Sequence, residues 1–588
     1  MNLNFMKLRE QMENQKVSYY LVPSEDPHQS EYVDDYFKCR QYISGFTGSA
    51  GTFLAGCEEG WLWTDGRYFT QAEGQISSDI TLMKQGVSGV PTILEFLKEH
   101  LQEGDTLGVN GFTISASYGK KIAKLVKQHG ASFRFDLRFV EELWAKDDRP
   151  AITKSTIYRH DIKYSGEHTD SKLARVREKM KELDANAFFL SSLPDIAWLF
   201  NLRGDDIACT PLFYSYAWIT IDKCFLFLRK DCISAVAFQR FKEHGISILD
   251  YTEVSAFLKD QHETVLLNPD LTNYLHYNLL FKCKIIEDKN PTELMKAIKN
   301  DIQIDHLKAC HINDGIAMTK FMYWLKKNVG KIPMTERMIS DHLERKKLPD
   351  YMGPSFETIC AYKDHAAMMH YQSTEESDVD VKAEGMLLID SGGQYYGGTT
   401  DVTRTFILGP ISEEERKYFT LVLKSMLTLA NAKFLFGCRG SNLDILAREP
   451  LWEDGVDYRC GTGHGVGYFL GVHEGPNAFR WRSNPENLDA VLQPGMVITD
   501  EPGVYVPGKY GIRTENMLIC KKWQQNEYGA FLHFEPLTLV PIDLDGVDLS
   551  LFNEKEKQLL TDYQQFVYDT LSPHLNEEES AWLHTLTL

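Results

Sequence analysis

A segment near the start of the chain returns, in altered form, further along it. LREQMENQKVSYYLVPSEDPH (Leu8 to His28) aligns with VREKMKELDANAFFLSSLPDI (Val176 to Ile196). Each stretch has the period of an amphipathic helix, then a short polar break, then an apolar run typical of a strand. Chance is an alternative, because a helix followed by a strand is a common pair. The agreement in order and spacing favours duplication, so the sequence predicts two related α/β domains.

Breaks in composition divide the rest of the chain. A chain of 588 residues is too long for one hydrophobic core. The charged, proline-containing stretch Asp147 to Pro150 ends the first repeat. We expect a first domain over residues 1–150, a related α/β domain over 151–303, a third domain over 304–530 and a C-terminal extension over 531–588.

The third segment has a different pattern. A long helical stretch from Asp305 to Val329 is followed by a shorter one, and a second long-and-short pair begins at Ser412. Strand-like runs follow each pair. The pattern predicts an α+β domain made of two similar halves, with its functional site where the halves meet.

Composition excludes several classes of function. The formal net charge is −20, so the surface repels phosphate backbones and nucleic-acid binding has no electrostatic basis. The sequence has no apolar run of membrane-spanning length and no secretory signal at its start. Eleven scattered cysteines indicate reduced thiols in a cytoplasmic protein. From the charge and the apolar runs, we expect the protein to bind neither nucleic acid nor membrane.

Four carboxylates follow or interrupt apolar strand-like runs. In LLIDSGGQYYGGTTDVTRTF, Asp390 ends one run and Asp401 begins the next, so a hairpin would bring them side by side. In VITDEPGVYVPGKYGIRTENMLI, Glu501 follows a second run, and we expect Glu515 inside a strand with Arg513 on the same face. A lone Asp is usually a solvated turn residue. Repetition of the pattern argues against that reading here, because buried carboxylates need compensation.

One glycine-rich stretch raises the question of a zinc site. RCGTGHGVGYFLGVHEGP holds Cys460, His464 and His473. Four carboxylates with one histidine instead make an oxygen-rich cage, whose charge two divalent cations would neutralise. Such donors favour manganese over a thiolate-bound zinc, with zinc or cobalt as substitutes.

The ordered motifs resemble a known family. They are VPSEDPHQSEY, FTGSAGT and WTDGRYF in the first domain, DIAWLFNLRG in the second, and MMHY, LIDSGGQYYGGTTDVTRT, GTGHGVG, VHEGP, TDEPG and GIRTEN in the third. This set resembles the pita-bread metallopeptidases, and among them the long, three-domain cytosolic form of aminopeptidase P. The resemblance implies two creatinase-like N-terminal α/β domains followed by a pita-bread catalytic domain.

The resemblance also implies a set of site residues. The five metal ligands of the family match Asp390, Asp401, His464, Glu501 and Glu515. Asp401 and Glu515 would bridge the two metals. The catalytic histidines of the family match His370 and His473, and Arg513 matches an arginine that supports the site. We expect His365 to be only a surface residue.

The activity implied is removal of an N-terminal residue from a peptide whose second residue is proline. A hydroxide shared by the two metals would attack the carbonyl carbon. Glu501 would accept the proton of the water, His473 would stabilise the oxyanion, and His370 or His473 would relay a proton to the leaving nitrogen. The family further implies a homodimer.

One departure and three alternatives accompany this hypothesis. Many relatives carry histidine where this chain has Cys460, so the contacts of the proline pocket differ. A prolidase, which cuts Xaa-Pro dipeptides, normally lacks the second N-terminal domain. Creatinase-like metal-free hydrolases and inactive pita-bread binding proteins have lost metal carboxylates that this chain keeps.

Overall fold

The computed structural model describes residues 2–587 apart from 235–238, 240, 242–243, 344, 346–347 and 483–487. The chain forms two compact units. One comprises Met1–His160 and Glu167–Thr292, and the other comprises Asp161–Gly166 and Glu293–Leu588. Within the described residues, no helix is both long enough and apolar enough to cross a membrane.

The first unit begins with a six-stranded sheet in the order β4-β3-β2-β1-β5-β6. β1 pairs antiparallel with β2 and parallel with β5, so β1 lies where the chain changes direction across the sheet. The strands are β1 (Tyr19–Val22), β2 (Thr52–Gly56), β3 (Gly60–Thr64), β4 (Ile80–Lys84), β5 (Thr106–Val109) and β6 (Ser132–Arg134). The helices are α1 (Leu3–Gln15), α2 (Cys39–Ser44), α3 (Phe69–Gln75), α4 (Ile93–His100), α5 (Ala116–Gln128) and α6 (Phe139–Trp144).

Local sequence explains how this sheet is covered. Asn2 caps α1 by accepting hydrogen bonds from the N–H groups of residues 4 and 5. Phe5, Leu8 and Met12 recur at helical spacing and are all buried, so this face of α1 packs on the sheet. The strand Tyr19–Val22 that follows is almost wholly buried.

A second six-stranded sheet in the same unit has the order β12-β11-β10-β8-β13-β14. Its parallel and antiparallel pairings repeat those of the first sheet strand for strand. Its strands are β8 (Ala187–Leu190), β10 (Ser215–Thr220), β11 (Cys224–Leu228), β12 (Ile246–Asp250), β13 (Thr264–Leu267) and β14 (Lys284–Glu287). Helix α8 (Thr169–Glu182) precedes β8 as α1 precedes β1. The prediction of two related α/β domains is therefore confirmed.

The remaining elements of the first unit are short. They are η1 (Asp35–Phe37), β7 (Tyr158–Arg159), α9 (Leu193–Phe200), β9 (Leu202–Arg203), η2 (Lys230–Cys232), η3 (Tyr251–Glu253), α11 (Val254–Lys259) and α12 (Tyr274–Leu279). β7 pairs antiparallel with β9.

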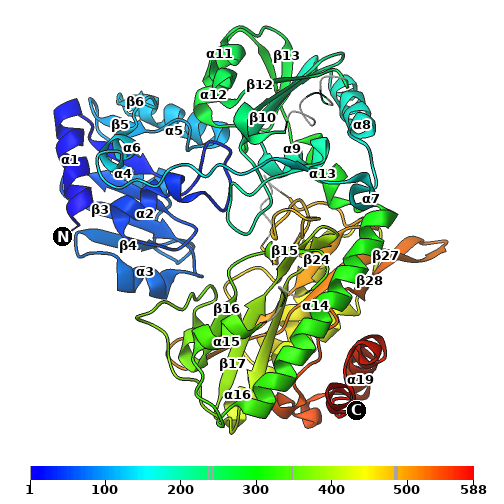
Figure 1. Ribbon diagram of the computed structural model, residues 1–588. Helices are drawn as coiled ribbons and strands as arrows, with labels where there is room; N and C mark the ends of the chain where they lie inside the picture. Colours follow the sequence, from blue (N-terminus) through cyan, green and yellow to red (C-terminus); the bar gives the residue numbers. More distant parts are fainter. Residues whose placement is uncertain are drawn as a thin grey trace. The chain divides into compact units, whose positions relative to one another are not determined.

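The second unit opens with α14 (Asp301–Asn328), the long green helix of Figure 1. Its N-terminus carries a reciprocal capping box between Asn300 and Gln303. The shorter α15 (Glu336–His342) follows. The second long helix, α16 (Glu413–Ala430), is followed by α17 (Gly440–Leu443) and α18 (Ile445–Trp452). The two long-and-short pairs expected from the sequence are thus present.

Two antiparallel sheets form the centre of this unit. One has the order β16-β17-β20, and the other has the order β21-β28-β27-β24. Their strands are β16 (Ile359–Tyr362), β17 (Met386–Ser391), β20 (Val402–Ile407), β21 (Lys433–Leu435), β24 (Val497–Asp500), β27 (Asn516–Asn526) and β28 (Gly529–Pro536). A smaller sheet has the order β15 (Tyr351–Pro354), β18 (Gly393–Tyr395), β19 (Gly398–Thr399). Two two-stranded ribbons pair β22 (Gly463–His464) with β23 (Ala478–Phe479), and β25 (Gly503–Val506) with β26 (Tyr510–Arg513).

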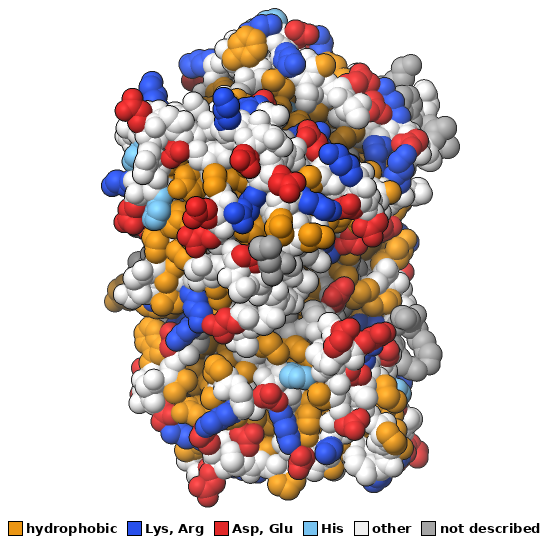
Figure 2. All heavy atoms as spheres, turned by 90° about the vertical axis from the view of Figure 1, so that its left-hand side faces the viewer, with side chains coloured by type: hydrophobic (Ala, Val, Ile, Leu, Met, Phe, Trp, Pro, Cys, Tyr) orange, Lys and Arg blue, Asp and Glu red, His pale blue; other side chains and the backbone are white. Residues whose placement is uncertain are grey.

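The C-terminal residues pack on these sheets through α19 (Glu554–Leu571), which is followed by α20 (Glu577–His584). The Tyr563 hydroxyl on α19 contacts the guanidinium of the fully buried Arg404 in β20 at 2.8 Å. Six further short helices lie among the described residues of this unit: α7 (Ile162–Ser165), α13 (Pro291–Ala297), η5 (Lys363–Ala367), η6 (Leu544–Gly546), η7 (Leu549–Leu551) and η8 (Ser572–His574). Figure 2 shows acidic and basic side chains interspersed over one face of the molecule.

Candidate metal centre

The first sheet of the second unit supplies two aspartates. Asp390 lies near the end of β17, and Asp401 immediately precedes β20. The two strands pair antiparallel with Asp390 opposite Thr403. The strand pair and its Gly-rich connection are as predicted. The register separates the two aspartates by two positions, because Asp390 is opposite Thr403 and Asp401 precedes Val402, the first paired residue of β20.

The second sheet supplies two glutamates. Glu501 directly follows β24. Glu515 lies between β26 and β27, so the prediction that it sits inside a strand was wrong. Its N–H donates to the carbonyl of Thr403 at 3.1 Å instead of entering the ladder of its own sheet. The physical reason is tertiary: this bond ties the Glu515 backbone to the sheet that carries the aspartates.

His464 is held by a close approach of backbones. Its N–H donates to Thr499 Oγ1 at 3.0 Å, which fixes it beside the end of β24. A Cβ on the next residue, Gly465, would lie 2.1 Å from the carbonyl oxygen of Glu474. Only glycine permits that contact, so the GHG motif serves to bring the His464 and Glu474 segments together.

These donors converge on one point. Ligand atoms of Asp401, His464 and Glu515 all lie within 4.8 Å of one another. His464 Nε2 is 3.5 Å from Asp401 Oδ2 and 3.3 Å from Glu501 Oε1. The mutual charges raise the pKa of His464 to about 9, although burial alone would lower it.

Asp390 joins the cluster through Arg513. The guanidinium donates from Nη2 to Asp390 Oδ2 at 2.7 Å and from Nε to Thr403 Oγ1 at 3.1 Å. Its Nη1 donates to the Tyr505 hydroxyl at 2.7 Å. Thr403 in turn donates to Glu515 Oε2 at 2.8 Å. Arg513 and Thr403 therefore connect one carboxylate of each sheet.

The cluster carries more negative charge than the protein compensates. Burial, followed by repulsion from Asp401 and Glu501, raises the pKa of Asp390 to about 7 even though Arg513 lowers it. Burial and the same repulsions raise the pKa of Glu515 well above its usual range. The buried Asp390 Oδ1 has no hydrogen-bond partner among the described residues. Four carboxylates facing one guanidinium, with an unused oxygen, fit a site for divalent cations with hard oxygen ligands.

His473 lies beside His464, with ring centroids 4.3 Å apart at an interplanar angle of 82°. The adjacent Glu474 donates its N–H to the Gly465 carbonyl at 2.8 Å. Its carboxylate accepts from Lys299 Nζ at 2.6 Å, and both side chains are almost fully buried. Lys296 Nζ lies 3.8 Å away. The loop that presents His473 is therefore fastened by a buried ion pair.

His370 lies in the turn after η5 and is half-buried. A Cβ on Gly511 of β26 would meet the Ala366 carbonyl oxygen of η5 at 1.7 Å, so this glycine allows the His370 segment to lie directly against the strand that ends at Arg513. Tyr371, the next residue, donates its hydroxyl to Glu336 Oε2 at 2.8 Å.

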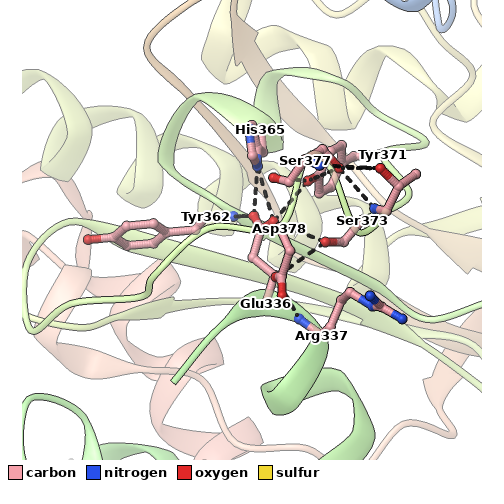
Figure 3. A network of polar contacts seen from close by, with 9 residues as sticks. Glu336, Arg337, Tyr362, His365, Tyr371, Ser373, Ser377 and Asp378 are labelled. Atoms are coloured by element: carbon pink, nitrogen blue, oxygen red, sulfur yellow. Dashed lines mark hydrogen bonds and ion pairs between the residues drawn. The ribbon is translucent and has the colours of Figure 1, made fainter. Parts of the chain in front are cut away.

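His365 is not the surface residue that was expected. Its Nδ1 lies 2.9 Å from Oε1 of Glu336, which is fully buried at the start of α15 (Figure 3). The N–H of Tyr362 donates to the same oxygen at 2.7 Å. The carboxylate raises the pKa of His365. The side chain anchors the segment that leads to His370, and the prediction failed because its partner lies far away in the sequence.

Cys460 is half-buried against the apolar cluster that includes Val504 and Ile512. It is not among the residues whose donor atoms converge. Its carbonyl accepts from Arg448 Nη2 at 2.8 Å.

Known proteins match the chain along its length. Models of the Creatinase/Prolidase N-terminal domain match residues 5–134 and 148–303. The model of metallopeptidase family M24 matches residues 305–522, and that of the C-terminal region of the same peptidases matches 530–588. A probable Xaa-Pro aminopeptidase P of Paracoccidioides brasiliensis (strain Pb03) is 36% identical over 98% of this chain and 97% of its own. One of Talaromyces marneffei is 38% identical over 98% of this chain and 91% of its own.

A solved structure is similar over the whole chain. It is the X-prolyl aminopeptidase from Caenorhabditis elegans, described as a cytosolic enzyme with a di-nuclear active site. It has 33% identity and a TM-score of 0.94, and the match covers 100% of this chain and 99% of that one.

Fold and site together define a metallohydrolase with two creatinase-type N-terminal domains and a pita-bread catalytic domain. The fold class expected from the sequence is confirmed. The chain belongs to metallopeptidase family M24, among its Xaa-Pro aminopeptidases. It is a metallo-aminopeptidase with a site for two divalent metal ions.

Sequence reasoning missed several residues around this site: Lys299, Glu336, Thr403, Thr499 and Tyr505. Thr403 had a usable signal, since it lies two positions after Asp401 in an alternating strand. Lys299 and Glu336 had none, because helix positions in an amphipathic pattern do not reveal which distant carboxylate or amide they meet.

Proposed function

We propose that the protein hydrolyses the bond between an N-terminal residue and a penultimate proline in peptides. The supporting observation is the convergence of hard donors from two sheets on a buried point that holds more negative than positive charge. The ligands would be Asp390, Asp401, His464, Glu501 and Glu515. The Xaa-Pro bond is a tertiary amide with no N–H, so it requires a pocket shaped for the ring.

Two divalent ions held by these residues would supply a water of lowered pKa and a Lewis acid for the carbonyl oxygen. The oxygen-rich ligand set favours Mn²⁺, with Zn²⁺ or Co²⁺ as substitutes. The chain's own residues handle the protons. Glu501, half-exposed at the end of β24, accepts the proton of the attacking water.

Two histidines act on the substrate side in this proposal. His473, whose ring lies against His464, donates to the carbonyl oxygen as negative charge develops there. His370 or His473 relays a proton to the departing proline nitrogen. Arg513 lowers the pKa of Asp390 and orients its carboxylate through the bond to Oδ2.

We further propose that the protein is a cytoplasmic homodimer. The support is the similarity to a nematode enzyme described as cytosolic, together with the family resemblance for the dimer. Sedimentation as a monomer at micromolar concentration would contradict the dimer.

The test uses metal-stripped protein on matched substrates. Activity on an Xaa-Pro-Yaa tripeptide should return on adding Mn²⁺, Co²⁺ or Zn²⁺, with Mn²⁺ the most effective. The tripeptide should be cleaved faster than the Xaa-Pro dipeptide. Preference for the dipeptide would indicate a prolidase, and full activity without metal would refute the metallopeptidase mechanism.

A further inference from the structure

A cavity lies at one edge of the first six-stranded sheet. Its volume is about 680 Å³, which is within the range of small-ligand sites. Residues just after β1, β3 and β4, the start of β2, and α4 and α5 contribute to its wall. β1 and β5 run parallel while the chain continues on opposite sides of them, so the cavity lies at a topological switch point of an open sheet. Ligands of open α/β sheets bind in that position.

In the second sheet, the segment that follows the matching strand is buried. There the chain passes from β8 into α9, of which all but Pro194 is buried. Ser191, the first residue after β8, accepts from His28 of the first domain, with Nδ1 2.8 Å from its carbonyl oxygen. Asn273 donates to the Pro27 carbonyl at 2.8 Å in the same region.

The wall of the cavity is polar and acidic. Glu25 and Glu31 contribute carboxylates, and none of the lining residues is lysine, arginine or histidine. Trp63 and Tyr118 add aromatic surface. The indole N–H of Trp63 is already used by the Pro91 carbonyl at 2.8 Å, so its ring serves as apolar wall. An acidic wall with aromatic rings is suited to an organic cation.

Glu25 carries the specific signal. Its Oε2 is buried and has no hydrogen-bond partner among the described residues. Arg40, a nearby cation, uses its guanidinium elsewhere: Nε donates to Ser24 Oγ at 2.9 Å and Nη1 to the Phe46 carbonyl at 2.7 Å. The remaining nitrogen donates to the Gly48 carbonyl. Burial without a donor is costly for a carboxylate oxygen, so a cation in the adjoining cavity would stabilise this carboxylate.

The charge of Glu25 also acts on Tyr118, another residue of the wall. Burial and then the charge of Glu25 raise the pKa of the phenol, so the hydroxyl of α5 lies in the field of the carboxylate. Burial likewise raises the pKa of Glu25, which a bound cation would reverse.

We infer that the cavity beside β1 binds an organic cation, whose ammonium or guanidinium group pairs with the carboxylate of Glu25 while its carbon atoms lie against Trp63 and Tyr118. The cation is either a free small molecule or the basic side chain of a peptide. This site is separate from the metal centre, and the inference does not depend on the proposed peptide specificity.

The test is calorimetric titration of the metal-loaded full chain with ethylguanidinium at constant ionic strength. Saturable binding is expected, and the neutral isostere ethylurea should not bind. Glu25→Gln should weaken binding about tenfold or more, since a hydrogen bond to a charged group is lost. Gln85→Trp, which adds bulk at an exposed lining position, should also block it. Glu58→Gln, an equal charge change at an exposed position of the same domain, should leave binding unaltered.

A second titration identifies the source of the cation. N-acetylarginine amide and N-acetylcitrulline amide have no free amine for the metal centre. Tighter binding of the arginine compound than of ethylguanidinium supports a peptide side chain, and weaker binding supports a free small cation. Equal binding of ethylurea and ethylguanidinium, no saturation by about 10 mM, or an unchanged affinity in a folded Glu25→Gln protein would overturn the inference. The ethylurea comparison decides the matter even if Glu25→Gln fails to fold.

Discussion

The second unit has two buried acidic clusters, one around Glu336 and one at the metal centre. They differ in whether groups of the protein provide partners for all the carboxylate oxygens. Glu336 is fully buried, yet its two oxygens accept from the Tyr362 N–H and the Tyr371 hydroxyl and contact His365 (Figure 3). The metal-centre cluster sets four carboxylates against Arg513 and leaves Asp390 Oδ1 without a donor. Burial of charge therefore does not identify a functional site by itself. Several carboxylates that converge with an unfinished set of partners are a stronger indication, because buried ions without partners are costly.

Among the variants that test this contrast, Asp401→Asn has the largest expected effect. Loss of one charged ligand should lower activity by about 10³-fold or more, equivalent to about 4 kcal/mol of transition-state stabilisation. Metal-free protein should lose no stability, because the change relieves repulsion with Glu515. The rise in melting temperature on adding Mn²⁺ should disappear. These quantities are measured by peptide hydrolysis and thermal melts.

The matched control for that change is Asp569→Asn, at an exposed position of α19. It should keep both activity and the metal-dependent rise. If Asp401→Asn protein still melted higher with Mn²⁺ by the wild-type margin, the acidic cluster would not be the metal site.

The Glu336 cluster, whose carboxylate oxygens have partners, should respond to mutation in the opposite way. Glu336→Ala removes the acceptor of two buried donors and should lower the free energy of unfolding by about 2–4 kcal/mol. Added metal should not restore the loss beyond its effect on the wild type. Chemical denaturation with and without Mn²⁺ measures the loss in the free energy of unfolding and the effect of added metal on it. Glu376→Ala, at an exposed position of the same region, is the control. Unchanged stability would show that these hydrogen bonds are not the anchor of the His370 segment.

These clusters also show how far the sequence leads. Repeated motifs predicted the two related sheets, and strand alternation predicted the β17–β20 pair, because both depend on local periodicity. The four carboxylates could be selected because each follows or interrupts an apolar run, whereas His464 and the full ligand set came from the family resemblance. Glu515 was placed in a strand because the pattern does not show that its N–H bonds to Thr403 of another sheet. His365 and Glu336 are 29 residues apart, and no local pattern links them.

A third prediction concerns the ion pair that fastens the His473 loop. Lys299 and Glu474 are 175 residues apart and buried, with Nζ to Oε1 at 2.6 Å. Lys299→Met keeps the aliphatic stem and leaves Glu474 without its nearest cation. We expect kcat to fall about 10- to 100-fold, as for supporting residues of metal sites, with KM and Mn²⁺ affinity nearly unchanged. Steady-state kinetics and metal titration test this split.

The matched control is Lys308→Met, at an exposed position of α14. The double variant Lys299→Met with Glu474→Gln has no unpaired buried charge and should recover part of kcat, which a double-mutant cycle would quantify. An equal fall in kcat and in the free energy of unfolding, without recovery in the double variant, would reduce the pair to a purely structural role.

The smallest expected effect is a pH dependence of stability carried by His365. In the folded protein, the carboxylate of Glu336 raises the pKa of His365 above the ordinary value of about 6.5. A raised pKa means that the folded protein binds the proton more tightly, so the stabilisation is fully present below about pH 6.5 and is lost as pH rises through the folded pKa. His365→Asn keeps a neutral donor and removes this titration. Relative to wild type, the variant should be less stable at pH 6 and nearly as stable at pH 9, as measured by urea unfolding.

His574→Asn, exposed in the same unit, should follow the wild-type profile. A constant difference between wild type and His365→Asn across this range would mean that the contact with Glu336 is an uncharged hydrogen bond, and the Glu336 cluster would then hold its carboxylate without any cation.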